Sequence, residues 1–289
     1  MIEKSQLEGP QKVTWCKGCG NFGILAALKK MAIQLEVPHE ELVLVSGIGC
    51  SGKLPHYINL NSFHTLHGRP IPIATGVHAT NGDLKVIVIT GDGDCLGEGL
   101  GHYLHAARRN VNLAVFIHNN GVNGLTKGQF SPASPRGYVS KTSPPPTGAP
   151  MDPVEPLALA IANGATYAAR GFSGDLPMLV ELMVQAVQHE GFAVIDIFQP
   201  CVTWNRQLTW KYYNEHTYSL QQEEHDVTDK MAAISKALED GEKIPIGLFY
   251  KTEKQHLTKG LAIPTDGKLR DKKNDPEKVQ KLIDRLVLE

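Results

Sequence analysis

Two short apolar runs, each followed at once by glycine and polar residues, constrain the fold of this chain more than any other feature. Val86–Ile89 leads into the Gly-Asp-Gly-Asp segment of residues 91–94, and Leu113–Ile117 leads into Asn119-Asn120. The 25 residues from 94 to 118 are just enough for one helix and one returning strand. Because parallel strands end on the same side, such a β-α-β unit brings both polar segments to one edge of the sheet. We therefore expect an α/β fold, a parallel sheet flanked by helices.

Other segments carry helix and strand patterns that fit the same fold. Apolar residues recur at helical spacing over residues 22–35, and short buried-strand runs follow at Leu42–Val45 and Ala193–Phe198. Eight prolines between Ser131 and Pro156 exclude regular structure from that stretch. The remaining expected elements are strands over 85–90 and 111–117, and helices over 98–109, 157–162 and 176–188.

Length and composition indicate one large domain with a C-terminal extension. The chain has 289 residues, of which 42% are hydrophobic and 20% charged, so it buries a sizeable core. Beyond about residue 210 the apolar density falls and the charge rises. We predict a main ligand-binding domain over residues 1–210 and an extension without a core of its own over 211–289.

The charge balance excludes some classes of partner. Twenty-nine Lys and Arg stand against 30 Asp and Glu, and a net charge of -1 gives no electrostatic reason to bind nucleic acid or an anionic membrane. No apolar run approaches the roughly 18 to 20 residues that span a bilayer. Five cysteines are too few for a disulfide scaffold and suit reduced thiols. We expect a cytoplasmic protein whose partner is a small molecule or another protein.

The polar strand ends carry the oxygen ligands that Mg²⁺ prefers. Gly91 and Gly93 let the backbone turn sharply around Asp92, whose carboxylate is a hard oxygen ligand. Asn120 offers an amide oxygen, and the main-chain carbonyl of Val122 offers a third protein ligand. Mg²⁺ commonly completes its six ligands with phosphate oxygens and water, so this pattern predicts a metal that holds a diphosphate. The alternative is two ordinary polar strand exits.

Four cysteines suggest a second inorganic site. Cys16 and Cys19 form a C-x-x-C, while Cys50 and Cys201 each follow a predicted strand. Four thiolates can hold zinc or an iron–sulfur cluster. Structural zinc sites tend to use two close pairs, and the second pair is missing, which favours a cluster. Four unrelated buried thiols are the alternative, and Cys95 is interpreted as a small buried hydrophobe.

Four separated motifs together resemble a known family. They are Gly-Ile-Gly-Cys-Ser-Gly at 47–52, Phe-His-Thr-Leu-His-Gly-Arg at 63–69, Gly-Asp-Gly followed by Asn-Asn, and Gly-Leu-Thr-Lys-Gly-Gln at 124–129. In this order they look like the β subunit of 2-oxoacid:ferredoxin oxidoreductases, over roughly residues 12–210. The sequence around His-Gly-Arg and Gly-Leu-Thr-Lys-Gly-Gln looks most like that of the 2-oxoglutarate members of the family. Pyruvate or broad-range enzymes are the next most similar members.

The resemblance implies cofactors and roles for particular residues. It implies thiamine diphosphate with Mg²⁺ on Asp92, Asn120 and Val122, and one 4Fe-4S cluster on Cys16, Cys19, Cys50 and Cys201. His67, favoured over His64 only by resemblance, would contact the cofactor and act in catalysis. Lys127 would help to hold the substrate carboxylate, with an ordinary surface lysine as the alternative. The implied cofactor-binding residues are Ile48, Gly49, Cys50, Ser51, His67, Gly91, Gly93, Asp94, Gly124 and Leu125.

The resemblance also implies a reaction and partners. Family members oxidatively decarboxylate a 2-oxoacid with coenzyme A, here 2-oxoglutarate to succinyl-CoA, or run the reverse carboxylation, and pass electrons through the cluster to ferredoxin. The pyrimidine-binding domain would belong to an α subunit, so the active site would lie at a heteromeric interface, in a dimer of heterodimers. Two alternatives stay open: a non-oxidative thiamine diphosphate decarboxylase or synthase subunit without a cluster, and a zinc-stabilised binding protein.

Overall fold

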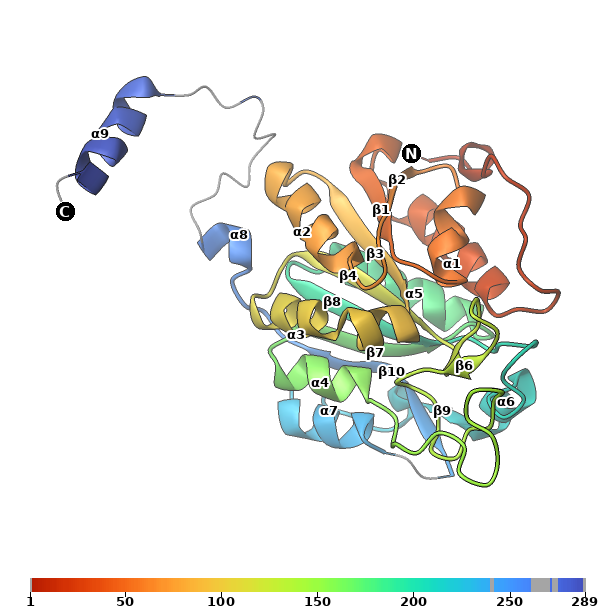
Figure 1. The fold of residues 1–289 in the computed structure, drawn as a ribbon. Coiled ribbons are helices and arrows are strands. Elements are labelled where there is room, and N and C mark those ends of the chain that lie inside the picture. Colours follow the sequence, from red (N-terminus) through yellow and green to blue (C-terminus); the bar gives the residue numbers. More distant parts are fainter. Residues whose placement is uncertain (1, 240–241, 261–270, 272–274, 288–289) are drawn as a thin grey trace.

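An eight-stranded, mostly parallel sheet runs through the centre of the molecule (Figure 1), as the sequence predicted. The computed structural model describes residues 2–239, 242–260, 271 and 275–287. Within them the strand order is β2-β1-β3-β4-β8-β7-β10-β9, and β10 alone runs antiparallel to a neighbour, β7. The strands are β1 (Leu42–Ser46), β2 (Asn61–His64), β3 (Lys85–Gly91), β4 (Leu113–Asn119), β7 (Tyr167–Phe172), β8 (Phe192–Phe198), β9 (Thr217–Ser219) and β10 (Ile244–Lys251), with a separate small hairpin of β5 (Val122–Asn123) and β6 (Gln129–Phe130).

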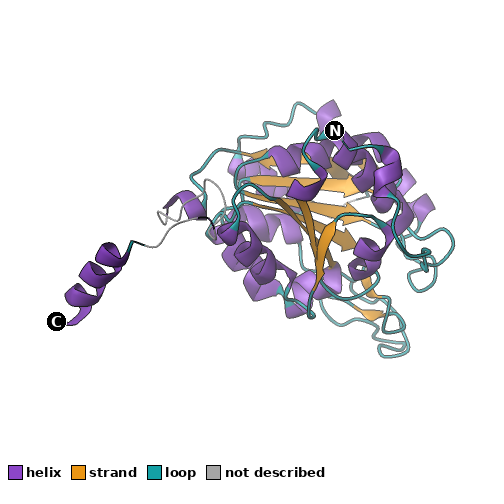
Figure 2. Cartoon of the chain, turned by 90° about the horizontal axis from the view of Figure 1, so that it is seen from above, coloured by secondary structure: helices purple, strands orange, loops and turns teal. Residues whose placement is uncertain are grey.

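Helices cover both faces of the sheet, which Figure 2 shows from above. Alternate side chains of each central strand point to opposite faces: in β1, Leu44 packs in the cluster beneath α1 and α5, while Val43 and Val45 pack in the cluster beneath α2, α3 and α4. Strands buried on both sides need the continuous apolar runs seen in the sequence. The helices are α1 (Asn21–Gln34), α2 (Pro70–Thr80), α3 (Leu100–Arg108), α4 (Pro156–Ala162), α5 (Leu176–Gln188), α6 (Trp210–His216), α7 (Lys230–Ala237), α8 (Leu257–Gly260) and α9 (Pro276–Val287).

Most predicted elements are confirmed, with small shifts at their ends. The helix predicted over 176–188 is α5, and no helix or strand occurs between residues 131 and 155. The helix predicted from residue 98 begins only at Leu100, because residues 93–98 form a π-helical turn that follows the glycine-rich strand end. The strand predicted over 111–117 lies two residues later, over 113–119, since Asn110 and Val111 close the preceding helix through backbone hydrogen bonds.

Four strands of the sheet, β2, β7, β9 and β10, have no counterpart in the sequence prediction. β7 has the sequence Tyr-Ala-Ala-Arg-Gly-Phe, whose small residues and arginine interrupt the expected apolar run. β10 lies in the predicted extension and completes the sheet by pairing with β7 and β9. The segments 240–241, 261–270, 272–274 and 288–289 of that extension lie outside the described residues. None of the helices that the structure describes is long and apolar enough to cross a membrane.

Candidate functional site

Four neighbouring parallel strands end together at one edge of the sheet, and each end carries a predicted site residue. Cys50 follows β1, Asp92 follows β3, Asn120 follows β4 and Cys201 follows β8. Since β1, β3, β4 and β8 are consecutive in the sheet, these four residues are brought to adjacent positions although 151 positions of sequence, 50 to 201, separate the first from the last. The carboxyl edge of a parallel sheet is where ligands bind in such folds.

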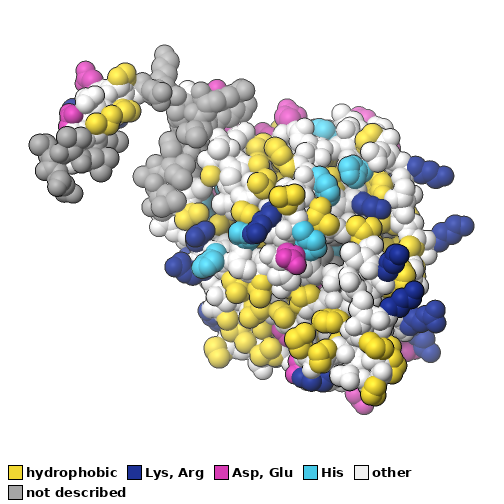
Figure 3. Space-filling model, in the orientation of Figure 1, with side chains coloured by type: hydrophobic (Ala, Val, Ile, Leu, Met, Phe, Trp, Pro, Cys, Tyr) yellow, Lys and Arg dark blue, Asp and Glu magenta, His cyan; other side chains and the backbone are white. Residues whose placement is uncertain are grey.

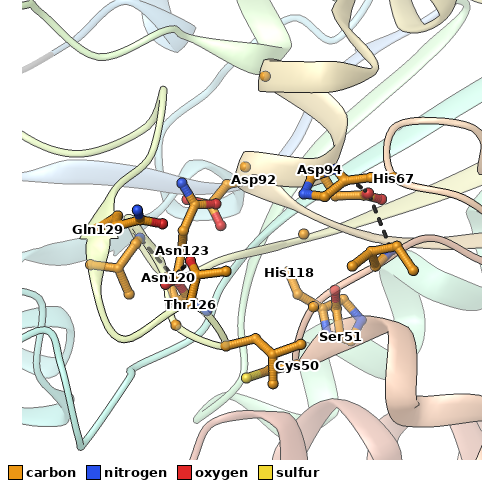
Figure 4. A pocket seen from close by; sticks show the side chains of 18 of the residues that line it. Cys50, Ser51, His67, Asp92, Asp94, His118, Asn120, Asn123, Thr126 and Gln129 are labelled. Carbon is orange, nitrogen blue, oxygen red and sulfur yellow. Dashed lines mark hydrogen bonds and ion pairs between the residues drawn. The ribbon is translucent and has the colours of Figure 1, made fainter.

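A cavity of about 390 Å³ opens at this edge (Figure 4). His67 has 46% of its side chain exposed and Leu125 is 51% exposed, so the cavity reaches the surface there. Every residue that the sequence analysis assigned to cofactor or Mg²⁺ binding lines it, namely Ile48, Gly49, Cys50, Ser51, His67, Gly91, Asp92, Gly93, Asp94, Asn120, Val122, Gly124 and Leu125.

The buried carboxyl group of Asp92 is suited to binding a cation. Its side chain is 2% exposed, and its Oδ2 accepts a hydrogen bond of 2.5 Å from the Ser131 hydroxyl. Loss of solvation on burial raises its pKa from 3.8 to about 7, although hydrogen bonds from Ser131 and nearby backbone amides oppose the rise. A bound divalent ion would compensate that burial, so the residue fits the predicted Mg²⁺.

Asn120 is held in one orientation beside Asp92. Its Nδ2 donates to Gln199 Oε1 over 2.8 Å, and its Oδ1 accepts from the Val122 backbone amide over 3.0 Å. An amide oxygen has two lone pairs, so Oδ1 keeps one for a metal. The carbonyl of Val122 accepts a hydrogen bond from the Gly124 amide. We call Asp92, Asn120 and Val122 the metal half of the site.

Asp94 joins the loops that surround the cavity. Its Oδ1 accepts hydrogen bonds from the backbone amides of Ile48 and Gly68 and pairs with His67 Nδ1 at 3.0 Å, while Oδ2 accepts from Thr90. The loop before Cys50 approaches so closely that a Cβ on Gly47 would lie 1.7 Å from this carboxylate. Asp94 therefore fixes the loop geometry as well as lining the cavity.

Of the two candidate histidines, only one reaches the cavity. His67 lies in its wall, whereas His64 is not among the lining residues and contacts the Ser46 hydroxyl through Nδ1 at 2.9 Å.

The four predicted cluster ligands lie close enough for their charges to interact. Loss of solvation, with smaller contributions from negative charge on Cys201, Cys50 and Cys16, raises the pKa of Cys19 to about 12. We call residues 120–130, which follow β4, the metal loop. A Cβ on Gly124 in this loop would stand 3.7 Å from Cys50 Sγ and 3.9 Å from Cys201 Sγ, so this glycine lies against both thiols. We call Cys16, Cys19, Cys50 and Cys201 the cysteine half.

The cysteine half has the donor chemistry of an iron–sulfur site. Within the described ranges, no three His, Cys, Asp or Glu side chains are already placed to bind one metal ion. Ligands of a four-iron cube each bind a different iron and stand farther apart than the ligands of a single ion. Four thiols gathered from three segments have the number and kind of donors that such a cube needs, and the charges of their neighbours contribute to the raised pKa values of Cys19 and Cys50.

Sequence comparison places the site in a known class of domain. Residues 47–197 match the family model described as thiamine pyrophosphate enzyme, C-terminal TPP binding domain. Residues 201–263 match the family model that describes the C-terminal part of the pyruvate ferredoxin oxidoreductase beta subunit. The first match spans the metal half, and the second begins at Cys201.

Curated relatives decide the family. A 2-oxoacid:ferredoxin oxidoreductase subunit beta from Sulfolobus is 47% identical over 256 residues, which cover 84% of this chain and 83% of that protein. The 2-oxoglutarate synthase subunit KorB of Methanocaldococcus jannaschii is 35% identical over 86% of this chain and 90% of its own length. The chain belongs to the 2-oxoacid:ferredoxin oxidoreductase β subunits.

A solved structure agrees with this assignment to the oxidoreductase family. The 2-oxoglutarate:ferredoxin oxidoreductase from Magnetococcus marinus, solved with 2-oxoglutarate, coenzyme A and succinyl-CoA bound, superposes with a TM-score of 0.87 at 39% identity. The match covers 90% of this chain and 89% of that one. The predicted family and fold class are therefore confirmed.

The three tryptophans of this β subunit all hold cysteine-bearing segments in place. Trp15 Nε1 donates to the carbonyl of Cys50 over 2.8 Å, and Trp210 Nε1 donates to the carbonyl of Gly18, inside the C-x-x-C loop, over 2.9 Å. Trp204 follows Cys201 and packs so closely on the metal loop that a Cβ on Gly128 would lie 2.9 Å from its ring. These contacts tie the N-terminal, central and C-terminal cysteines together.

Two predicted residues stand apart from the cavity. Lys127 belongs to the metal loop, adopts φ 71° and is exposed, and it is not among the residues that line the cavity. Its role toward the substrate stays a prediction. Cys95 is 1% exposed and packs in the core beneath α2 and α3, where burial raises the pKa of its thiol well above the ordinary value.

Sequence reasoning missed three polar residues of the site. Ser131 holds Asp92, Gln199 holds Asn120, and His118 lies in the cavity wall at the end of β4. Gln199 and His118 could have been noticed as polar residues at the carboxyl ends of apolar strands, the same signal that singled out Asp92. Ser131 had no such signal, because it reaches Asp92 from the proline-rich segment across 39 positions of sequence.

Proposed function

We propose that this chain is the subunit of a 2-oxoglutarate:ferredoxin oxidoreductase that holds thiamine diphosphate, Mg²⁺ and one 4Fe-4S cluster. The reaction is the coenzyme A-dependent oxidative decarboxylation of 2-oxoglutarate to succinyl-CoA, or the reverse carboxylation, with ferredoxin as the electron partner. The proposed setting is the cytoplasm, in keeping with thiols that are all unpaired.

The observation that carries the proposal is the joining of the two halves by one buried side chain. Gln199, 1% exposed, accepts from Asn120 Nδ2 through Oε1 and donates through Nε2 to Cys19 Sγ over 3.4 Å. A thiamine enzyme that does not transfer electrons has no need of four thiols beside its diphosphate site. An oxidoreductase needs both, because electrons released at the organic cofactor must reach an acceptor nearby.

Each half has a distinct task in this proposal. Asp92, Asn120 and Val122 would hold Mg²⁺ and so the diphosphate, and His67 with the loop 48–51 would line the rest of the cofactor pocket. The four cysteines would hold the cluster. Thiamine diphosphate supplies a carbon nucleophile and an electron sink when bound, and the chain's own residues orient it and exclude water from it.

Two relatives support 2-oxoglutarate as the substrate. The Methanocaldococcus jannaschii protein is named a 2-oxoglutarate synthase subunit, and the Magnetococcus marinus structure contains 2-oxoglutarate and succinyl-CoA. In the proposed enzyme Lys127 helps to hold a carboxylate of the substrate once the site is complete. Pyruvate is the second candidate, because residues 201–263 match a pyruvate oxidoreductase model.

The cavity rim supports an α subunit as the missing part of the active site. Leu66, next to His67, is 76% exposed, and Leu125 at the cavity edge is 51% exposed. Figure 3 shows hydrophobic side chains interspersed with histidine and basic residues on one face of the molecule. Exposed apolar residues beside a ligand site favour a protein partner, here the subunit that bears the pyrimidine-binding domain, in a dimer of heterodimers.

Anaerobic purification together with the α subunit tests the proposal. We expect a brown complex with an iron–sulfur EPR signal after reduction, and reduction of a low-potential acceptor that needs both 2-oxoglutarate and coenzyme A. Faster turnover of pyruvate would replace the proposed substrate. A colourless protein that holds thiamine diphosphate would indicate the non-oxidative class, and a protein that holds only zinc would refute both.

A further inference from the structure

The last described helix carries an apolar stripe that is open to solvent. In α9, apolar residues recur at spacings of three and four, at positions 279, 282, 283 and 286, which is the pattern of a helix that packs one face on a partner. Val279 is 49% exposed and Ile283 is 47% exposed, and Figure 1 shows the helix standing clear of the other elements. A helix of 12 residues is marginal in water by itself, so its stability depends on burying that stripe.

A groove of matching character lies between α1 and α5, which pack together on one face of the sheet. The groove has a volume of about 400 Å³, and its apolar lining comes from Leu176, Pro177, Val180 and Val184 of α5. Leu176 and Val184 contact the core cluster but are only partly buried. Polar residues of both helices complete the lining. An apolar groove between two helices, edged by polar side chains, is a shape that receives an amphipathic helix.

The chain enters its C-terminal tail beside one end of this groove. Lys259 of α8 lines a second cavity together with Gln185, and Gln185 also lines the groove. Between the end of α8 at Gly260 and the start of α9 there are 15 residues, 261–275, which can span up to about 50 Å. Since α5 has 13 residues and is about 20 Å long, the whole groove is within reach of α9.

The place of α9 in the sequence favours the groove of its own chain over another protein. A segment tethered to its binding site by a chain of this length has an effective concentration in the millimolar range. The two family models match residues 47–197 and 201–263, so α9 lies outside the matched segments and a subunit interface common to the family need not include it.

The charges beside the two apolar surfaces are complementary. Lys30 of α1 and Glu181 of α5 give the groove one charge of each sign. Asp284 and Arg285 of α9 are exposed and supply the opposite pair. With 12 residues, α9 is about 18 Å long and matches the length of α5.

We propose that α9 docks in the groove between α1 and α5 of its own chain, with its apolar stripe against Leu176 and Val184. The docked helix would tie α1, which begins directly after the C-x-x-C loop, to α5. The inference does not rest on the proposed function, because no residue assigned to a cofactor lines the groove.

Photo-crosslinking in the full-length chain, purified with its partner subunit, tests where the stripe lies. With p-benzoylphenylalanine in place of Val279, we expect a crosslink, mapped by mass spectrometry, to α1 or α5 in a product with the mass of one chain. The same group in place of Lys281, on the polar side of α9, is the matched control and should give less than about one fifth of that product. A crosslink to the partner subunit, a product with the mass of two copies of this chain, or no product above the control would each overturn the proposal.

Amide hydrogen exchange of the same complex gives a readout without the bulky crosslinker. Docking should slow exchange over residues 279–287 by about 100-fold relative to a peptide of that sequence. Val184→Glu puts a charge in the groove and should remove at least about 10-fold of this protection, as should Ile283→Glu in the helix itself. Gln188→Glu, at the exposed end of α5 outside the groove, should change nothing. Peptide-like exchange of α9 in the wild type, or full protection in both Val184→Glu and Ile283→Glu, would refute docking in this groove.

Discussion

The metal half and the cysteine half meet at the same sheet edge but are built in different ways. Asp92, Asn120 and Val122 come from a single β-α-β unit and the loop that follows it, and only their supports Ser131 and Gln199 come from farther along the chain. The four cysteines come from three segments spread over residues 16–201 and depend on tryptophan contacts to stay together. The difference teaches that one part of a site can be encoded locally while its neighbour depends on the complete fold.

The largest expected effect is the loss of the cluster from the cysteine half while the metal half still binds its ligands. Cys201→Ser should abolish the cluster, since serine is a poor ligand for iron, and should leave Mg²⁺-dependent thiamine diphosphate binding within about 2-fold of the wild type. Iron and sulfide analysis and EPR measure the first part, and calorimetry the second. Cys95→Ser is the matched control and should keep a normal cluster. A normal cluster in Cys201→Ser would remove that residue from the ligand set.

The converse variant tests the metal half. Asp92→Asn removes the one buried carboxylate that the proposal assigns to Mg²⁺ and should weaken Mg²⁺-dependent binding of both thiamine diphosphate and pyrophosphate by about 100-fold or more. Iron content and the EPR signal should not change. Loss of the cluster in this variant would mean that the two halves fold as one unit.

A substitution of Gln199 should affect the metal half and the cysteine half together. Gln199→Leu removes the acceptor for Asn120 Nδ2 and the donor to Cys19 Sγ, so both halves should respond. We expect about 10-fold weaker Mg²⁺ binding, as for loss of a supporting hydrogen bond in other metal sites, together with a shifted reduction potential of the cluster. Protein-film voltammetry measures the potential. An effect confined to one half would show that the bridge does not couple them.

The pH dependence of Mg²⁺ binding should report on the metal half alone. Because burial raises the pKa of Asp92 to about 7, Mg²⁺ must displace a proton below that pH, and its apparent affinity should fall about 3-fold between pH 7.5 and 6.5. The native pKa exceeds the unfolded value of 3.8, so this group makes the metal-free fold less stable as pH rises from 3.8 through 7. Mg²⁺ titrations over this range, with Asp92→Asn as the pH-independent reference, check the sign.

The smallest effect concerns the supports of the cysteine half. Trp15→Phe removes the hydrogen bond to the Cys50 carbonyl and should lower the free energy of unfolding by about 1 kcal/mol, while the visible absorbance of the cluster decays faster in a chelator. Tyr103→Phe is the control, because it removes a hydrogen bond to Pro156 on the opposite face of the sheet. That variant should lose similar stability without faster cluster release.

The locally encoded parts of the molecule could be predicted from the sequence. The apolar runs before Asp92 and Asn120 predicted both strands and the sheet edge that they share, because an apolar strand and its polar end can be recognised within a few residues. β7 was not predicted because it contains a buried charged residue, Arg170. This side chain can be buried in the sheet only because it pairs with the carboxylates of Asp196 and Glu155 on neighbouring segments. β10 likewise becomes a strand through its pairing with β7.

The supporting residues of the site show the same limit. Ser131, Gln199 and His118 act through partners at sequence separations of 39, 79 and 97 residues. No spacing in the sequence predicts such contacts, because they form only in the folded chain. The cofactor-binding motifs, in contrast, can be recognised from the sequence alone.

The placement of the tryptophans gives the molecule an optical consequence. All three indoles of the chain contact cysteine-bearing segments or the metal loop beside them, so ultraviolet emission from the protein originates at one edge of the sheet. A chromophore assembled on the four thiols would absorb that light by energy transfer. The intensity of tryptophan emission from this chain should therefore report how much of the protein holds the cluster, and it should increase as iron is removed.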